Sequence, residues 1–461
     1  MLHGISKQEF GQELNKHLKP SGPIDSIELL QGRGQQLSRI DQALFTPGRH
    51  IFIYGDRGVG KSSLAQTAAN QYQSSDEAVL LQGCTRTSTF LGVFNEISKK
   101  AIKKIEEKKI TFKAGLKLKF LSLERTSETT KHSGGMLIST MDDALSLIDE
   151  ISKTHSTRPI IVIDEFDAIE SAEERAYFSE FLKMMGDSHT WVPIIFTGIA
   201  NSLENLLGAH QSSYRQIEAI YLDRLSWDGR WDIFKQALDA FDVKYHPDIP
   251  YRVAGISDGF PYYVHSITEK LMWAVYSDEE EVSSIDLERY FEAVVDAAEA
   301  ISTRLKGPYD KATERNLGEQ YHYVIWGAAA TSMLKRQVSE MYESYSFVVQ
   351  QLKSLPNNER VVCLERETFS RRISSLTKDS FGGLLTRTTS KNGFYEFSEN
   401  MIRGYAKLVA EIHGVEIWKQ DAPTPRNFAP IPWSQINKSY RNYKSGKPQG
   451  YPRRTNWNSK L

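Results

Sequence analysis

The chain is poor in cysteine and has no long apolar run. Its 461 residues include two cysteines, Cys84 and Cys363, too few for a disulfide framework or a cysteine-rich zinc site. The N-terminal segment lacks the apolar core of a secretion signal. No stretch approaches the roughly 18 apolar residues that cross a bilayer. We therefore expect a cytoplasmic protein without membrane contact.

The chain also has almost no net charge. Its 57 lysines and arginines nearly balance its 58 aspartates and glutamates, so the overall charge indicates neither a nucleic-acid nor a membrane partner. The hydrophobic content of 40% is ordinary for a globular protein. A chain of this length is expected to form two to four domains.

A complete phosphate-binding loop is the most specific motif present. Gly55 to Ser62 matches G-x-x-x-x-G-K-[ST], with an apolar strand predicted before it and a helix after it. Such a loop turns backbone N–H groups and a helix N-terminus toward phosphate oxygens. We expect Lys61 to contact the β- and γ-phosphates of ATP and Ser62 to bind Mg²⁺. The predicted nucleotide-binding residues here are Gly55, Asp56, Arg57, Gly58, Val59, Gly60, Lys61, Ser62 and Ser63.

An acidic pair follows another predicted strand. Four aliphatic residues, Ile160–Ile163, lead into Asp164 and Glu165. In open α/β sheets, ligands bind at the carboxyl ends of the strands. Asp164 is therefore predicted to hold Mg²⁺, through water, and Glu165 to polarise the water that attacks ATP. With the upstream loop, the pair predicts an ATPase.

Two further positions are candidates for contact with the γ-phosphate. Asn201 follows the strand Val192–Thr197 and is the first candidate for a sensor, with Thr197 second; capping of the next helix is the alternative role for Asn201. Arg215 precedes the last strand, where ring-forming ATPases place an arginine that enters the neighbouring subunit's site. Arg224 is the rival for this role, and a local surface ion pair is the alternative for Arg215.

Five apolar segments predict a parallel sheet. They are Ile51–Tyr54, Val79–Gln82, Ile160–Ile163, Val192–Thr197 and Ile217–Leu222. Their alternation with helical segments is typical of an α/β fold with helices on both faces. We therefore assign residues 26–227 to a P-loop ATPase core. A lysine-rich insertion at about 99–135 interrupts it, with a helix at Asn95–Lys109 and a hairpin at Phe112–Phe120.

The rest of the chain divides by composition. Residues 1–25 are an N-terminal extension, 228–300 a helical lid, 301–415 a winged-helix domain and 416–461 a basic, disordered tail. The winged helix-turn-helix is predicted from a helix at Thr368–Thr377 and an Asn-Gly hairpin that ends in Phe394–Phe397. From Lys419 on, nine basic residues face one acidic residue.

Four elements together resemble the AAA+ ATPases. They are Gln31-Gly32-Arg33, Asp164-Glu165, Gly198-Ile199-Ala200-Asn201 and Gly259-Phe260-Pro261. The nearest types are the origin-recognition initiator ATPases and the STAND signalling ATPases. The resemblance covers about 26–300, and more loosely extends to 410. It implies that Gly32 and Arg33 flank the adenine and that Gly259 and Pro261 of the lid pack on the base or sugar. Initiators carry a lid arginine where this chain has Tyr262 and Tyr263, which favours the STAND type.

Three basic segments are candidates for DNA contact. They are the insertion lysines, the tail with its tyrosines and tryptophan, and Arg371, Arg372, Lys378, Arg387 and Lys391 of the winged helix. Each has an alternative role: a solvated helix face, a peptide that docks on a partner, and a module that packs on the nucleotide domain. The sequence thus leaves two functions open. One is an ATP-driven homo-oligomeric switch or motor acting on DNA. The other is a STAND-like scaffold, for example in anti-phage defence, that activates a protein effector.

Overall fold

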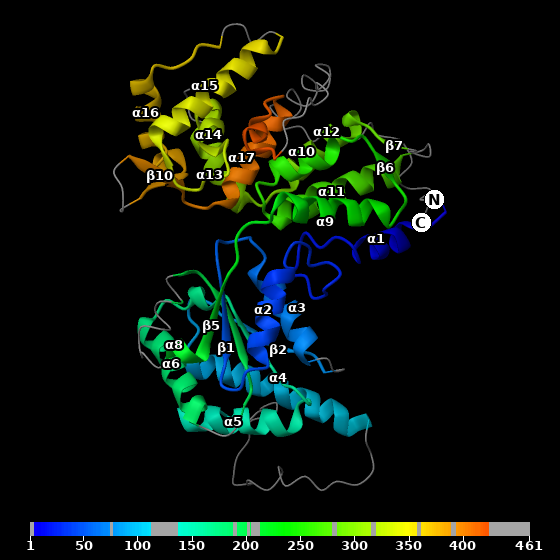
Figure 1. Cartoon of the computed structure of the whole chain (residues 1–461), viewed down its shortest axis with the longest axis vertical. Helices are drawn as coiled ribbons and strands as arrows, with labels where there is room; N and C mark the ends of the chain where they lie inside the picture. Colours follow the sequence, from blue (N-terminus) through cyan, green and yellow to red (C-terminus); the bar gives the residue numbers. More distant parts are fainter. Residues whose placement is uncertain are drawn as a thin grey trace, which may run out of the picture. The chain divides into compact units, whose positions relative to one another are not determined.

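The computed structural model describes residues 4–73, 77–111, 137–187, 191–200, 203, 213–278, 284–314, 320–356, 361–388 and 393–423 (Figure 1). These residues form two compact units. The sheet unit consists of Pro23–Asp56 and Gly60–Asp223, and the helical unit consists of the described parts of Met1–Gly22, Arg57–Val59 and Arg224–Leu461.

A five-stranded parallel sheet forms the centre of the sheet unit, in the order β2-β3-β4-β1-β5. Its strands are β1 (His50–Tyr54), β2 (Leu80–Gly83), β3 (Ile161–Asp164), β4 (Ile194–Gly198) and β5 (Ile217–Tyr221). Each lies within two residues of a predicted strand, so the α/β fold is confirmed. The inner strand β1 has Ile51, Phe52 and Ile53 fully buried, as expected where helices cover both faces.

Helices connect these strands. They are α2 (Gly34–Leu44), α3 (Lys61–Gln73), α4 (Phe90–Thr111), α5 (Met141–Thr154), α6 (Ala172–Asp187) and the short α8 (Ser213–Gln216). The predicted lysine-rich helix lies within α4 and is confirmed as a helix. The hairpin predicted at Phe112–Phe120 lies outside the described residues.

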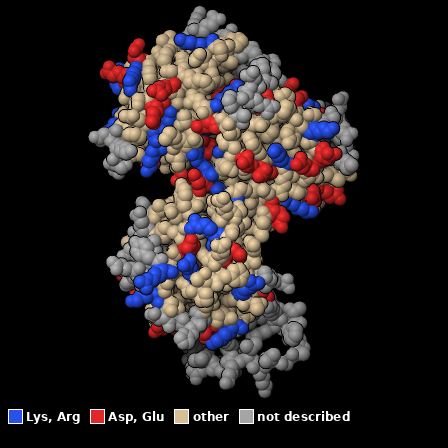
Figure 2. Space-filling model, viewed as in Figure 1, with Lys and Arg blue, Asp and Glu red and all other residues tan. Residues whose placement is uncertain are grey.

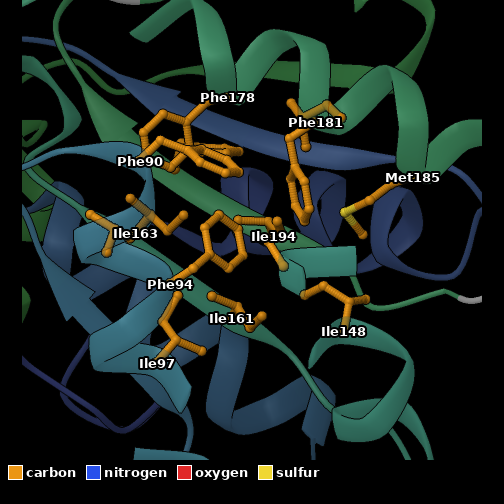
Figure 3. Close-up of a cluster of buried hydrophobic side chains, with 14 of the residues drawn as sticks. Phe90, Phe94, Ile97, Ile148, Ile161, Ile163, Phe178, Phe181, Met185 and Ile194 are labelled. Carbon is orange, nitrogen blue, oxygen red and sulfur yellow. The ribbon is translucent and has the colours of Figure 1, made fainter. Parts of the chain in front are cut away.

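An aromatic cluster fixes α4 and α6 to the sheet (Figure 3). Phe94 of α4 lies 4.6 Å from Phe181 of α6 between ring centroids, and Phe90 lies 5.0 Å from Phe178. The strands β3 and β4 supply Ile161, Ile163 and Ile194 to the same cluster. Because buried aromatic rings contribute large apolar areas, this cluster holds the end of β3, with its acidic pair, in a fixed position.

Four helices begin the main part of the helical unit. They are α9 (Trp227–Asp239), α10 (Ile249–Ile256), α11 (Pro261–Ser277) and α12 (Leu287–Ala300). Amphipathic patterns in this segment predict helices at Trp231–Phe241, Tyr262–Tyr276 and Ile285–Ala300, and these correspond to α9, α11 and α12. The prediction that 228–300 is all helix is wrong at one place, since β6 (Lys244–Tyr245) pairs in parallel with β7 (Ser284–Ile285). Two-residue strands are too short to produce a readable alternation of side chains.

The N-terminal helix α1 (Lys7–Leu14) packs against α11. Ser6 and Glu9 form a capping box at its start. The ring of Phe10 stacks on Tyr276 at 4.4 Å and meets the edge of Trp273 at 4.9 Å. The N-terminal extension is therefore an integral part of the helical unit.

A second set of elements completes the helical unit. It comprises α13 (Thr303–Glu314), α14 (Gln320–Ala329), β8 (Arg336–Gln337), α15 (Val338–Ser354), α16 (Arg366–Ser375), β9 (Leu385–Arg387), β10 (Phe394–Phe397), α17 (Met401–Ile412) and the 3₁₀ turn η4 (Ile417–Asp421). The strands form an antiparallel sheet in the order β8-β10-β9. The predicted helix at Thr368–Thr377 corresponds to α16, and the predicted hairpin is β9–β10. The winged-helix interpretation of this set stays a prediction.

The described surface agrees with the balanced composition. On the face shown in Figure 2, basic and acidic side chains are interspersed over both units. Within the described ranges, no helix is both long enough and apolar enough to cross a membrane. Cys84 and Cys363 are both free thiols.

We predict that His265 of α11 makes the protein sensitive to acid. Its ring is buried, and neither ring nitrogen has a hydrogen-bond partner among the described residues. Burial lowers the pKa of His265 to about 4. Because the unfolded chain takes up this proton near pH 6.5, the folded state should keep its stability above that pH and lose up to roughly 3 kcal/mol as the pH falls toward 4.

Chemical unfolding of wild-type protein and His265→Leu at pH 7 and pH 4.5 checks this. The leucine variant should lose less stability between the two pH values. An equal loss in both proteins would contradict the prediction.

Candidate nucleotide site

The loop between β1 and α3 has a backbone that requires glycine at two positions. Gly58 has φ 78° and Gly60 has φ 97°, in the left-handed region that side chains disfavour. The loop leads directly into α3, whose first residue is Lys61. Its backbone N–H groups are thus placed at a helix N-terminus, the arrangement that binds phosphate.

The Lys61 ammonium lies over its own loop. Its Nζ donates to the carbonyl oxygens of Gly55 at 3.0 Å and Asp56 at 2.8 Å. These contacts hold a positive charge beside the backbone donors of the loop. The charge therefore lies where the phosphates of a nucleotide would bind.

Ser62 and Asp164 come together from positions 102 residues apart in the sequence. The Ser62 hydroxyl donates to Asp164 Oδ1 at 2.9 Å. Hydroxyl and carboxylate oxygens are hard ligands that suit Mg²⁺. These two residues therefore fit the predicted metal site.

Thr197, at the end of β4, connects the two acids of the predicted pair. Its hydroxyl donates to Asp164 Oδ1 and accepts a hydrogen bond from the Glu165 backbone N–H at 3.0 Å. Glu165 has φ 54° and ψ 42°, a left-handed conformation that costs a non-glycine residue roughly 1–2 kcal/mol. The Thr197 hydroxyl helps to hold this strained residue in place. Asn201, the first sensor candidate, lies outside the described residues.

The acidic side chains concentrate negative charge at this edge of the sheet. Burial, together with the charges of Asp164, Glu165 and Asp167, raises the pKa of the Cys84 thiol to about 12. The thiol therefore stays protonated at neutral pH. A divalent cation would offset this negative charge.

Ser63, a predicted nucleotide-binding residue, contacts the segment before α2. Its hydroxyl accepts from the Ile24 backbone N–H at 3.0 Å, and Asn70 donates to the Asp25 carbonyl at 2.9 Å. The segment that leads to the predicted adenine-flanking residues is thus fixed to α3. The sequence did not indicate this contact, because neither partner belongs to a recognisable motif.

The two residues predicted to flank the adenine differ in what their positions demand of them. Gly32 has φ 69°, which favours glycine. Arg33 is buried at the start of α2; burial lowers its pKa to about 10, against the opposing charge of Asp223. Arg33 therefore remains a cation at neutral pH.

The two candidates for a trans-acting arginine differ in exposure. Arg215 of α8 has an exposed side chain. Arg224 is largely buried in the helical unit and pairs with Asp258 at 2.8 Å. The exposure of Arg215 favours it, and the role stays a prediction.

Gly259 and Pro261 form a turn in the helical unit. Gly259 has φ 84°, and a Cβ there would lie 2.8 Å from Arg224 Cβ and 3.0 Å from the Leu225 carbonyl. Pro261 is the first residue of α11, a position that suits proline. Tyr263 is buried and donates to the Met401 carbonyl at 2.6 Å. Contact of this turn with a nucleotide stays a prediction.

Two insertion lysines with described side chains make contacts inside the sheet unit. Lys99 pairs with Glu96 at 2.6 Å, and Lys100 donates to the Gln82 side chain at 2.8 Å and to the Leu81 carbonyl. The side chains of the other insertion lysines are outside the described residues.

Two arginines of the predicted winged helix are also engaged. Arg372 donates to Gln320 and lies 5.0 Å from the ring centroid of Tyr321. Arg387 donates to Ser374 at 2.8 Å and to Tyr395 at 3.2 Å. Arg371 and Lys378 are exposed. Lys391 and the tail after residue 423 lie outside the described residues. The predicted disorder of the tail is wrong at its start, because η4 is ordered and Trp418 is buried there.

Comparison with known proteins agrees with this geometry. Residues 29–192 match the family described as the AAA ATPase domain. Over these residues the chain is similar to AAA ATPase domains, and this match confirms the resemblance seen in the sequence. No curated protein matches the chain.

Several solved structures are similar to the chain at low sequence identity, and the first of them shares its fold. A Walker-type ATPase of Pyrococcus abyssi has a TM-score of 0.50 and 14% identity, over 84% of this chain and 99% of that chain. The ORC2 protein of Aeropyrum pernix, solved as ADPNP–ADP complexes, has a TM-score of 0.45 and 11% identity, over 85% of this chain and 97% of that chain. The ORC1 protein of the same organism, solved with DNA, has a TM-score of 0.40 and 14% identity, over 84% of this chain and 95% of that chain.

Thr197→Val should destabilise the sheet unit by about 1–3 kcal/mol. Valine keeps the volume but leaves the Glu165 N–H without its acceptor, and an unsatisfied buried donor costs about that much. Thr197→Ser keeps the oxygen and should lose much less. Chemical unfolding of both variants beside wild type measures the difference. Equal losses in the two variants would show that packing, and not the hydroxyl, matters at this position.

Proposed function

We propose that this chain binds ATP with Mg²⁺, hydrolyses it, and acts as a nucleotide-driven oligomerising switch. One observation carries the proposal. Asp164 accepts the Ser62 hydroxyl at 2.9 Å while the neighbouring Glu165 is held by Thr197. The proposed metal ligands and the residue proposed as general base therefore lie in or beside the phosphate loop, which supports phosphoryl transfer to water.

The proposed reaction is direct attack of water on the γ-phosphorus. Glu165 accepts the water proton, the new P–O bond forms, and the bond to the β-phosphate oxygen breaks to leave ADP and phosphate. Lys61 offsets phosphate charge, and Ser62 and Asp164 would hold Mg²⁺. Bound Mg²⁺ supplies charge neutralisation to the phosphate oxygens.

The remaining predicted site residues complete the proposal. Gly32, Arg33, Gly259 and Pro261 would contact the adenosine part. Asn201 would sense the γ-phosphate, and Arg215 of a neighbouring copy would stabilise the transition state. Because this last role needs a second subunit, the proposal includes a homo-oligomer.

The contacts of four basic side chains weaken the case for DNA as the partner. Lys99, Lys100, Arg372 and Arg387 each bind groups of their own unit. A side chain that contacts DNA phosphates would have to give up these contacts. We therefore place a STAND-like switch ahead of a motor acting on DNA.

DNA remains the second candidate partner because two residues predicted to contact it have exposed side chains. Arg371 lies on α16 and Lys378 follows it, both with accessible side chains. A basic helix of this kind can contact phosphates. The two functions make opposite predictions about stimulation by DNA.

Two substitutions test the site itself. Lys61→Ala should abolish ATP binding, since it removes the cation beside the phosphate loop. Glu165→Gln should keep ATP binding and reduce turnover at least about 100-fold, as expected for loss of a general base. Calorimetry measures binding and phosphate release measures turnover. Wild-type turnover by Glu165→Gln would contradict the role of Glu165.

The partner class is tested by turnover and particle mass. If the chain is a STAND-like switch, ATP turnover with duplex or single-stranded DNA at low salt should stay within about twofold of turnover without DNA. Glu165→Gln should then form larger particles with ATP than with ADP. Phosphate contacts weaken steeply with salt. Stimulation by DNA that disappears at moderate salt, and in Arg371→Ala with Lys378→Ala, would favour the DNA function.

A further inference from the structure

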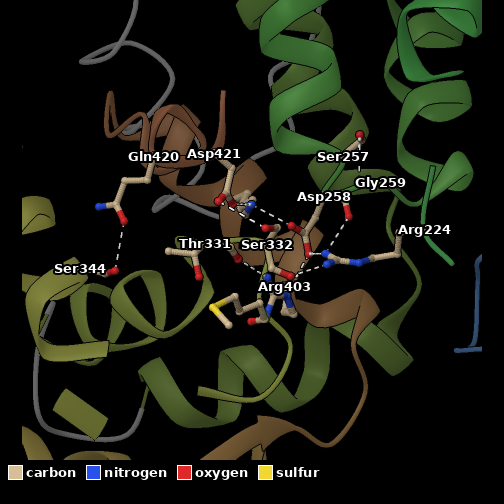
Figure 4. Close-up of polar contacts among 12 residues, drawn as sticks. Arg224, Ser257, Asp258, Gly259, Thr331, Ser332, Ser344, Arg403, Gln420 and Asp421 are labelled. Carbon is tan, nitrogen blue, oxygen red and sulfur yellow. Dashed lines mark hydrogen bonds and ion pairs between the residues drawn. The ribbon is translucent and has the colours of Figure 1, made fainter. Parts of the chain in front are cut away.

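One buried carboxylate joins the predicted lid turn to the C-terminal helix. Asp258 directly precedes Gly259, and 3% of its surface is exposed. Its Oδ2 accepts from Arg224 and from Arg403, each at 2.8 Å, and its Oδ1 lies 2.7 Å from Lys407 Nζ. Figure 4 shows Asp258, Arg224 and Arg403 converging from separate elements.

The cations come from both ends of the helical unit. Arg224 lies on the segment that enters it, and Arg403 and Lys407 lie one turn apart on α17. Arg403 also donates to the Met333 carbonyl at 2.7 Å and to the Thr331 carbonyl. Asp258 therefore ties α17 and the loop after α14 to the turn that begins α11.

The charge on Asp258 depends on these partners. Burial alone would raise its pKa, but Arg403, Lys407 and Arg224 together lower the pKa of this carboxyl well below its usual range. Its φ of 51° is also in the left-handed region. Separation of α17 from the turn would leave buried charges without partners, which is strongly unfavourable.

Close packing also holds α17 against α11 and α10. A Cβ on Gly404 of α17 would lie 2.3 Å from the ring of Tyr263, so the two helices approach too closely for any side chain there. Further along α17, Glu411 pairs with Arg252 of α10 at 2.8 Å, and both are fully buried. Trp418 of η4 donates to Glu411 at 2.9 Å.

We propose that Asp258 makes α17 part of the nucleotide-responsive lid, so that α10–α12 and the C-terminal elements respond to nucleotide as one body. This inference rests on the proposed function, because it requires the turn Gly259–Pro261 to sense the nucleotide. The C-terminal elements then report the nucleotide state to a partner without separating from the lid.

Hydrogen exchange of the full chain tests the joint, with and without Mg²⁺–ADP. In wild type, ADP should slow exchange in peptides from α11 and from α17. In Lys407→Met, α11 should still respond while α17 responds much less. Lys407→Arg keeps the charge and should restore the response. Asp258→Asn should behave as Lys407→Met does.

A matched control removes buried contacts elsewhere in the C-terminal elements. Arg336 donates to the carbonyls of Gly327 and Ala328 and to Ser344, without touching Asp258. Arg336→Met should lower stability but leave the response of α17 to ADP intact. ADP affinity should fall about tenfold in Lys407→Met, a common size for coupling between sites, and stay near wild type in Arg336→Met.

The outcomes separate this inference from the proposed function. Wild-type protein that binds ADP by calorimetry with unchanged exchange in α17 overturns the inference alone. Equal losses of ADP affinity in Lys407→Met and Arg336→Met also overturn it, since stability would then explain both. A wild-type chain that binds neither ATP nor ADP overturns the proposed function and this inference with it.

Discussion

The candidate site depends on the hydrogen bonds made by one carboxylate, Asp164. Its Oδ1 accepts from Ser62, at the start of α3, and from Thr197, at the end of β4. Asp164 itself ends β3. Side chains from α3, which follows β1, and from β4 therefore donate to one oxygen at the end of β3. The order β3-β4-β1 makes this convergence possible, because it brings the carboxyl ends of these strands to one edge.

The sheet can hold this arrangement because its covering helices are firmly packed. Phe166 follows Glu165 directly, and its ring lies 5.2 Å from Phe178 and 5.4 Å from Phe196. The strained Glu165 thus has a hydroxyl contact on one side and an aromatic anchor on the other. Strain of this kind persists only where surrounding structure overdetermines the conformation, and it is common at functional sites.

The sequence predicted those parts that depend on local pattern. The loop Gly55–Ser62, the acidic pair and the five strands follow from motif spacing and apolar runs, and the structure has them at the predicted positions. It could not predict that Thr197 connects Asp164 to the Glu165 backbone, because one threonine in an apolar strand carries no signal. The pairing of β6 with β7 was missed for the same reason, since two residues are too few to form a period.

The sequence also could not predict ion pairs between residues far apart in the chain. Arg224 was a rival for a role at the nucleotide, yet it binds Asp258 within the helical unit. Nothing near residue 224 in the sequence distinguishes an arginine that pairs internally from one that reaches a neighbour. The difference is decided by Asp258, Arg403 and Lys407, which lie 34 to about 180 residues further along the chain.

Asp164 and Asp258 show how neighbours decide what a carboxylate does. Among the described residues, the side-chain partners of Asp164 are two neutral hydroxyls, so its negative charge stays available to a cation from solution. Asp258 has three fixed cations within 2.8 Å and cannot serve as a metal ligand. The first arrangement suits an exchangeable ligand such as Mg²⁺ with a nucleotide. The second suits a permanent joint, because its charges are already satisfied and separation would expose them. One unit thus has a carboxylate that can change partners, and the other has one that cannot.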